Sequence, residues 1–250
     1  MTVLIITGMH RSGTSLTAAL LQKLGVNVGE NLFPADRFNP RGYFEDVDFL
    51  EFQRQVLQKC CDPGDPGWHD WGWTVEETLQ PELFVHYQDQ ALALLEKRAH
   101  LRGIWGWKDP RTSLMLDFWH SLIPQAKYLF VFRYPWDVAD SIRRLHAPIF
   151  TAHPEYILPI WRYYNRHLLN FYHRYPQQCL LFSIHHLDRL PQLIHLCRTK
   201  LNLPLSSDNL EQIQKEVFHR ELLHQLPPQF DALDRETLMV LQELEASADI

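Results

Sequence analysis

The chain has 250 residues and a formal net charge of −6 at pH 7 with its histidines neutral. This length suits one large α/β domain with a substantial core, and the acidic balance argues against a general nucleic-acid binder. No cysteine pair has the C-x-x-C spacing of a zinc site, and the cysteines suggest no disulfide framework. Without a signal-peptide pattern or an apolar run approaching the roughly 18 residues of a membrane span, we expect a soluble cytoplasmic protein.

The first predicted unit, "VLIITGMHRSGTSLTAALLQKLG", consists of a strand, a loop and a helix. An apolar β-branched run covers residues 3–7, the loop contains Gly8 and Gly13, and an amphipathic run covers residues 14–24. Such a loop points backbone N–H groups inward, in front of the positive end of the helix dipole. It therefore favours a bound phosphate or sulfate.

This loop departs from the nucleoside-triphosphate pattern G-x-x-x-x-G-K-[ST]. Thr14 stands where that pattern has lysine, and the positive charge lies at Arg11. A guanidinium can hold an anion through two parallel hydrogen bonds, which suits a sulfate or terminal phosphate without a metal. The simpler alternative is a glycine-containing turn that binds nothing.

Further strands alternate with helices along the chain. After a possible short strand and a turn at 39–42, we expect a helix around 49–57, a tryptophan-rich loop at 62–73 and a helix at 81–98. A short strand then ends near Lys108, and strands at 128–132 and 179–184 are each followed by a helix. The pattern predicts an α/β fold in one domain over 1–250: a three-layer, P-loop-like arrangement with a central parallel sheet flanked by helices. Residues from about 207 to 250 are predicted as a helical acidic segment.

Charged side chains follow several of these strands. Ligands of parallel sheets bind at the carboxyl ends of the strands, and the first loop, Lys108 and Arg133 all lie at such ends. Ser141 comes eight residues after Arg133, in the second turn of the next predicted helix, so both side chains could face one crevice and share an anion. The alternative is that Lys108 and Arg133 merely pair with Asp109 and Asp137.

Together with "GMHRSGTS" and "KDPR", this arrangement resembles the sulfotransferase family that uses 3′-phosphoadenosine 5′-phosphosulfate (PAPS), above all its bacterial, carbohydrate and tyrosyl-protein branches. The resemblance runs from Val3 to about Leu190. It implies sulfuryl transfer to a hydroxyl or amine of a small-molecule, carbohydrate or peptide acceptor, with no metal. It also implies that the 5′-phosphosulfate is bound by a loop of five residues: Arg11, Ser12, Gly13, Thr14 and Ser15.

The same resemblance implies that Arg133 and Ser141 hold the 3′-phosphate and that Lys108 lies against the transferring sulfuryl group. It places the catalytic base near Glu45, in "RGYFED". That carboxylate is aligned by region only, so Asp46 and His10 are competing candidates for the base. The alternative for Glu45 itself is a solvated loop carboxylate without a catalytic role. The glycine-rich C-terminal nucleotide motif of the classical cytosolic enzymes is absent.

Two other functions stay open at this point. A P-loop kinase dependent on a nucleoside triphosphate lacks its lysine at position 14, although Asp109 could be argued as a magnesium ligand. A non-catalytic nucleotide-binding or scaffold protein of the same fold could use the tryptophan-rich loop and the acidic tail for a partner. Trp68, Trp71 and Trp73 could stack on an acceptor or form local core. The sequence identifies neither the acceptor nor the oligomeric state.

Overall fold

Four parallel strands form the central sheet of the protein. The computed structural model describes residues 2–65, 67, 68, 70–206, 210, 212, 213 and 233–250. The strand order is β2-β1-β3-β4, and every neighbouring pair is parallel. The strands are β1 (Thr2–Thr7), β2 (Ile104–Lys108), β3 (Lys127–Phe132) and β4 (Cys179–Ser183). The sequence-predicted strands at 3–7, 128–132 and 179–184 therefore belong to one sheet, as expected.

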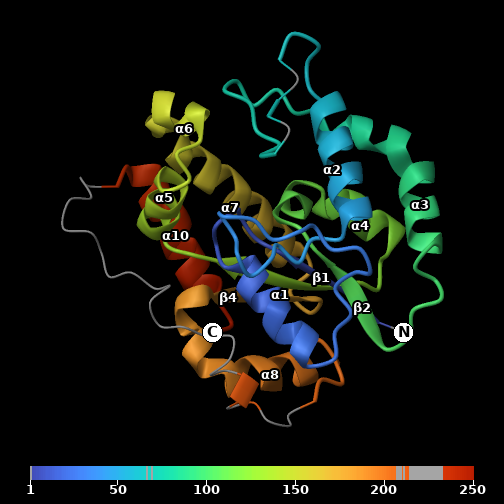
Figure 1. Ribbon diagram of the computed structural model, residues 1–250. Coiled ribbons are helices and arrows are strands. Elements are labelled where there is room, and N and C mark those ends of the chain that lie inside the picture. The colour runs from blue at the N-terminus through green and yellow to red at the C-terminus, as the bar shows by residue number, and fades with distance from the viewer. Residues whose placement is uncertain (1, 66, 69, 207–209, 211, 214–232) are drawn as a thin grey trace.

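Helices cover both faces of this sheet (Figure 1). Because side chains alternate along β1, Leu4 and Ile6 face a core made with α1 (Thr14–Lys23) and α8 (Leu190–Thr199). Val3 and Ile5 face the opposite core. That core is made with α2 (Val47–Lys59), α4 (Leu116–Leu122), α7 (Ile157–Arg174) and α10 (Arg235–Ser247). The predicted three-layer α/β architecture is confirmed.

Shorter elements complete the connections. They are α3 (Gln88–Glu96), α5 (Pro135–Arg143), α6 (Pro148–Ala152), and the 3-10 helices η1 (Pro81–Tyr87), η2 (Pro110–Leu114), η3 (Pro154–Tyr156) and η4 (Ile184–Arg189). Two proline-led starts have local causes: Pro135 occupies the first position of α5, and Asp109 caps η2 in front of Pro110. The segment expected as one helix over 81–98 is thus η1 followed by α3.

Both edges of the sheet are covered by other parts of the chain. The Asp249 N–H donates to Leu181 O at 2.8 Å, and the Ser183 N–H donates to Ile250 O at 3.2 Å, so the last residues run along β4. On the other edge, the possible strand after the first helix is reduced to a single bridge between Asn27 and Trp105. Such coverage protects exposed strand edges from pairing with other chains.

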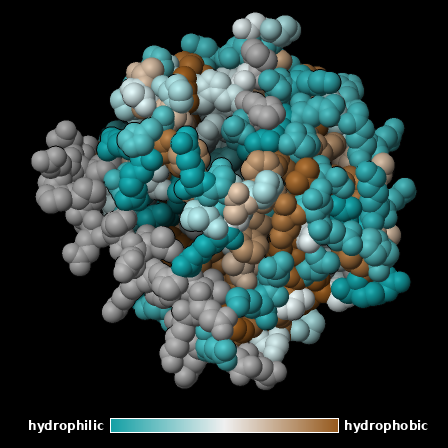
Figure 2. Space-filling model, in the orientation of Figure 1, coloured by the Kyte–Doolittle hydropathy of each residue, from teal (hydrophilic) through white to brown (hydrophobic). Residues whose placement is uncertain are grey.

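The predicted acidic helical segment is described only in part. Its last stretch forms α10, which packs on α7, whereas 207–209, 211 and 214–232 lie outside the described residues. The face shown in Figure 2 is mainly hydrophilic, with a hydrophobic band near its centre. Most apolar side chains of the described strands lie in the two cores.

Candidate active site

The loop between β1 and α1 is shaped by its two glycines. A Cβ at Gly8 would lie 2.0 Å from Val131 O, so only glycine lets the loop pack this closely on β3. Gly13 has a φ of 93°, in the left-handed region that favours glycine, and directly precedes α1. Arg11 also has a positive φ, 66°. This backbone places the N-terminus of α1 at the carboxyl edge of the sheet, where an anion is stabilised.

One buried group in this loop fits a bound oxyanion. Among the described residues, Ser12 Oγ is buried and has no hydrogen-bond partner. A buried hydroxyl without a partner carries a free-energy cost that a phosphate or sulfate oxygen would remove. The residues present therefore suit the phosphosulfate group that the sequence resemblance implied for this loop.

Arg11, Ser141 and Arg133 come together beside the loop. The Arg11 Nε donates to Ser141 Oγ at 2.9 Å, and Arg133 Nη1 donates to Arg11 O at 3.3 Å. Burial lowers the pKa of both guanidinium groups from its usual value, although an arginine side chain keeps its positive charge in proteins. The structure thus brings the two predicted 3′-phosphate residues to one place, with Arg11 between them.

Asp137 lies next to Arg133 and also contacts His185. Asp137 Oδ2 is 3.9 Å from Arg133 Nε and 2.9 Å from His185 Nε2, and the His185 ring stacks on Tyr134. The sequence-based alternative that Arg133 pairs with Asp137 is therefore present in the structure, alongside the contact with the loop. Sequence analysis missed His185, because its place in a His-His pair carries no spacing signal.

Lys108 and Glu45 form a buried ion pair at the same edge. Lys108 Nζ is 2.6 Å from Glu45 Oε1 and donates to Ser15 Oγ at 3.3 Å. Lys108 is 1% exposed and Glu45 is 6% exposed. Glu45 is therefore not a solvated loop carboxylate, and Lys108 pairs with it rather than with Asp109. The turn at 39–42 and the chain after it bring Glu45 across from the first loop.

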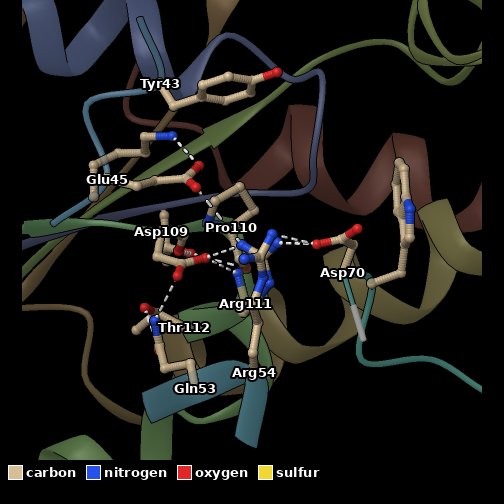
Figure 3. A network of polar contacts seen from close by, with 12 residues as sticks. Tyr43, Glu45, Gln53, Arg54, Asp70, Asp109, Pro110, Arg111 and Thr112 are labelled. Atoms are coloured by element: carbon tan, nitrogen blue, oxygen red, sulfur yellow. Dashed lines mark hydrogen bonds and ion pairs between the residues drawn. The ribbon is translucent and has the colours of Figure 1, made fainter. Parts of the chain in front are cut away.

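A polar network continues from Glu45 toward the tryptophan-rich loop (Figure 3). Arg111 Nη1 lies 3.7 Å from Glu45 Oε2 and 3.0 Å from Asp109 Oδ1, while Arg111 Nη2 lies 3.2 Å from Asp70 Oδ1. Gln53 Nε2 donates to the other Asp109 oxygen at 2.8 Å. Burial raises the pKa of the Asp109 carboxyl, and the Arg111 charge opposes that rise. Asp109 is thus enclosed by protein groups.

Arg111, Gln53 and Asp70 were not singled out from the sequence. Arg111 stands in "KDPR", so the signal was a second basic residue three positions after the strand-end lysine. Asp70 and Gln53 had no such signal, because the contact of Asp70 with Arg111 and that of Gln53 with Asp109 depend on how the tryptophan-rich loop and α2 pack over the sheet.

The two competitors of Glu45 lie in different surroundings. Asp46 caps α2 by accepting from the Asp48 N–H, and both of its oxygens accept from Arg98 Nη2 at 2.9 Å. Asp46 is therefore occupied by structural contacts. His10 is partly buried, with its ring 4.4 Å from that of Trp71. Burial, followed by the charge of Arg111, holds the pKa of His10 well below its usual value.

The tryptophan-rich loop forms local core. Trp73 is buried, and Trp68 and Trp71 pack against the larger core cluster. The rings of both Trp68 and Trp71 meet Phe150 edge-on, at 5.9 and 4.9 Å. Of the two expectations for these side chains, packing is the one that the contacts support. The loop also carries Asp70 to Arg111.

Within the described part of the chain, no group of three or more His, Cys, Asp or Glu side chains is arranged to hold a metal ion. None of the described helices is both long and apolar enough to cross a membrane.

A cavity of about 400 Å³ opens between η1, α4 and α7, and none of its lining residues belongs to the site described above.

The comparisons with known proteins agree with this architecture. A family model described as "Sulfotransferase family" matches residues 4–188. Among solved structures, the sulfotransferase domain of the curacin biosynthetic pathway is 17% identical, with a TM-score of 0.56 and coverage of 98% of this chain and 97% of that one. The sulfotransferase domain of the Synechococcus PCC 7002 olefin synthase is 21% identical, with a TM-score of 0.53 and coverage of 100% and 95%.

A third similar structure is a sulfotransferase from Alicyclobacillus acidocaldarius, 16% identical, with a TM-score of 0.54 and coverage of 100% of this chain and 97% of that one. At these identities the solved structures support the fold. A comparison with curated proteins finds no match.

Proposed function

The chain belongs to the sulfotransferase family, and from that premise we propose that it transfers a sulfuryl group from PAPS to an acceptor hydroxyl or amine. The observation that carries this proposal is the meeting of two groups of side chains at the carboxyl edge of one sheet. The anion-binding loop, with its buried Ser12 hydroxyl, lies beside Arg11, Ser141 and Arg133. The Lys108–Glu45 pair lies against the same loop through Ser15.

The two groups correspond to the two ends of the donor. We assign the 5′-phosphosulfate to the loop formed by Arg11, Ser12, Gly13, Thr14 and Ser15, where backbone N–H groups and the α1 dipole favour negative charge. We assign the 3′-phosphate to Arg133 and Ser141, because charge-assisted hydrogen bonds from a guanidinium suit a phosphate. Arg11 contacts Ser141 already and so links the two sites.

The proposed reaction is an in-line displacement at sulfur. The acceptor oxygen or nitrogen forms a bond to sulfur while the bond from sulfur to the bridging phosphate oxygen breaks. The bridging electron pair stays with the departing 3′-phosphoadenosine 5′-phosphate (PAP). The acceptor proton goes to Glu45. Negative charge grows on the leaving phosphate oxygen, where Lys108, Arg11 and the loop N–H groups stabilise it.

The proposed roles of Lys108 and Glu45 depend on each other. In the structure the ammonium group holds the carboxylate at 2.6 Å. As Lys108 turns toward the developing charge on the leaving group, its hold on Glu45 weakens. Glu45 is then a better proton acceptor at the moment when the acceptor loses its proton.

The kinase alternative has less support from the site. Thr14 occupies the position of the P-loop lysine, and Asp109, its candidate magnesium ligand, already pairs with Arg111 and Gln53. The scaffold alternative requires no buried pair of opposite charges at the donor site. Such a pair contributes little to stability relative to apolar packing, so a chemical role accounts better for Lys108 and Glu45.

Ligand-induced stabilisation separates these functions. We expect PAP to bind the proposed donor site more tightly than ATP with magnesium does, and therefore to raise the thermal unfolding midpoint more. A ligand that binds only the folded state stabilises it by about 2.7 kcal/mol at 100 times its Kd. The measurement is a thermal shift at equal ligand concentrations. A larger shift with ATP and magnesium would favour the kinase. PAP binding without transfer to any acceptor of a broad panel would favour the scaffold.

A change at the 3′-phosphate site should act on binding. Replacing Arg133 by alanine is expected to weaken PAP binding by roughly 10- to 150-fold, because one charge-assisted contact contributes about 1.5 to 3 kcal/mol. Calorimetric titration with PAP measures this change. Single-turnover transfer at saturating PAPS should change less, because the 3′-phosphate is remote from the sulfur.

The matched control is Arg166→Ala, which removes an ion pair between α7 and α10. We expect it to leave PAP affinity unaltered. Wild-type affinity in the Arg133 variant would show that the 3′-phosphate binds elsewhere.

A further inference from the structure

We propose that the acceptor carries a carboxylate a few bonds from the group that receives the sulfuryl group, and that this carboxylate replaces Asp70 on Arg54 and Arg111. The inference rests on the proposed function, because it takes Glu45 as the mark of the reacting acceptor group. It adds the chemical class of the acceptor, which neither the family match nor the similar structures specify.

Asp70 occupies the position that we assign to the carboxylate of the acceptor. One of its oxygens lies 3.2 Å from Arg111 Nη2 and 2.5 Å from Arg54 Nη2. The Arg111 and Arg54 side chains are 4% and 16% exposed and come from η2 and α2, whereas the Asp70 side chain is 56% exposed on the tryptophan-rich loop (Figure 3). Two anchored cations thus share a carboxylate that reaches in from the solvent side.

The position of Arg111 ties this anion site to the reacting centre. Its Nη1 faces Glu45 Oε2 at 3.7 Å, and its Nη2 faces Asp70. One guanidinium therefore separates the proposed base from the proposed anion site. A carboxylate bound where Asp70 lies would place the following atoms of the same molecule alongside Glu45. The distance fits a hydroxyl or amine only a few bonds away.

Three polar atoms around this position lack a hydrogen bond. Among the described residues, Arg54 Nε, Arg111 Nε and His10 Nε2 are all buried without a partner. Buried donors without partners are costly, and a guanidinium binds a carboxylate best through two parallel bonds. The Asp70 carboxylate is itself more than half exposed, so solvent screens its ion pairs and limits what they contribute to stability. Exchange of Asp70 for a ligand carboxylate that reaches these donors is therefore favourable.

Paired ligands test the inference directly. We would titrate the protein, saturated with PAP, with hydroxy acids and with their primary amides, in which only the carboxylate is changed: 4-hydroxyphenylacetate, 3-hydroxydecanoate and glucuronate. We expect at least one acid to bind about tenfold or more tightly than its amide, the effect of a charge-assisted contact. Arg54→Gln should remove most of this preference, because Arg111 alone is then left to hold the carboxylate. Asp70→Asn should strengthen binding of the acid by removing its internal competitor.

Two further variants keep the test independent of folding. Arg54→Lys retains the positive charge and should keep part of the acid preference. Arg162→Gln is the matched control, because Arg162 is a similarly exposed arginine that pairs with Asp234 far along the chain, and it should keep the whole preference.

Equal affinity for acid and amide in every pair, including no binding of either, would overturn the inference. Weaker acid binding by Asp70→Asn would also overturn it, because Asp70 would then help the ligand rather than compete with it.

Sulfuryl transfer from PAPS is measured separately. Transfer to the amides as fast as to the acids refutes the inference and supports the proposed function. Binding that prefers the acid, without any sulfuryl transfer, supports the proposed carboxylate site at Arg54 and Arg111 and counts against the proposed function.

Discussion

Replacing Lys108 by methionine is expected to slow single-turnover sulfuryl transfer by about 10²- to 10³-fold, the loss typical when one donor to a developing negative charge is removed. Methionine keeps most of the side-chain volume at this buried strand end and removes the charge. We expect PAP affinity to change much less, because the ground-state anion keeps the loop N–H groups, Arg11 and Ser12. The measurement is single-turnover transfer from saturating PAPS, with PAP titration beside it.

Lys200→Met provides a matched control for this experiment. Lys200 also forms an ion pair at 2.6 Å, with Asp249, but it lies beside the chain end that covers β4. Its loss should affect stability and leave the transfer rate unaltered. If Lys108→Met transferred the sulfuryl group at the wild-type rate, or if both variants slowed equally, Lys108 would be a structural residue and the leaving group would be stabilised elsewhere.

The strands could be predicted from the sequence because their signal is local. The runs at 3–7, 128–132 and 179–184 are apolar and end in turn or helix signals, and a parallel sheet buries both of its faces. The edge contacts of Asn27 and Asp249 could not be predicted. They join residues far apart in the sequence and leave no periodic pattern.

The site divides in the same way. Arg11, Lys108 and Arg133 were predictable because each lies at the carboxyl end of a recognisable strand, and parallel strands bring those ends to one edge. The contact of Arg111 with Asp70 was not predictable, since it requires the loop at 62–73 to pack against Phe150 and return to the sheet. Site residues on strand ends follow from topology, whereas those on long loops depend on tertiary packing.

The choice of base is the point on which sequence and geometry together give the most definite expectation. Replacing Glu45 by glutamine keeps the size of the side chain, its place beside Lys108 and a hydrogen-bonding oxygen, but it removes the ability to accept a proton. We therefore expect unaltered PAP affinity and single-turnover transfer slowed by about 10²- to 10⁴-fold, the usual contribution of general-base catalysis. The acceptor is first identified by screening.

Asp46→Asn and His10→Ala complete this comparison, and their surroundings set their expected results. The Asp46 side chain caps α2 and binds Arg98, so its substitution should lower stability and leave the transfer rate of the folded protein nearly unaltered. Desolvation and nearby positive charges lower the pKa of His10, which makes it a poor proton acceptor. Its loss should alter packing against Trp71 more than catalysis. Normal transfer by Glu45→Gln together with collapse in either other variant would move the base to that residue, because a side chain that accepts the proton cannot be replaced by one that does not.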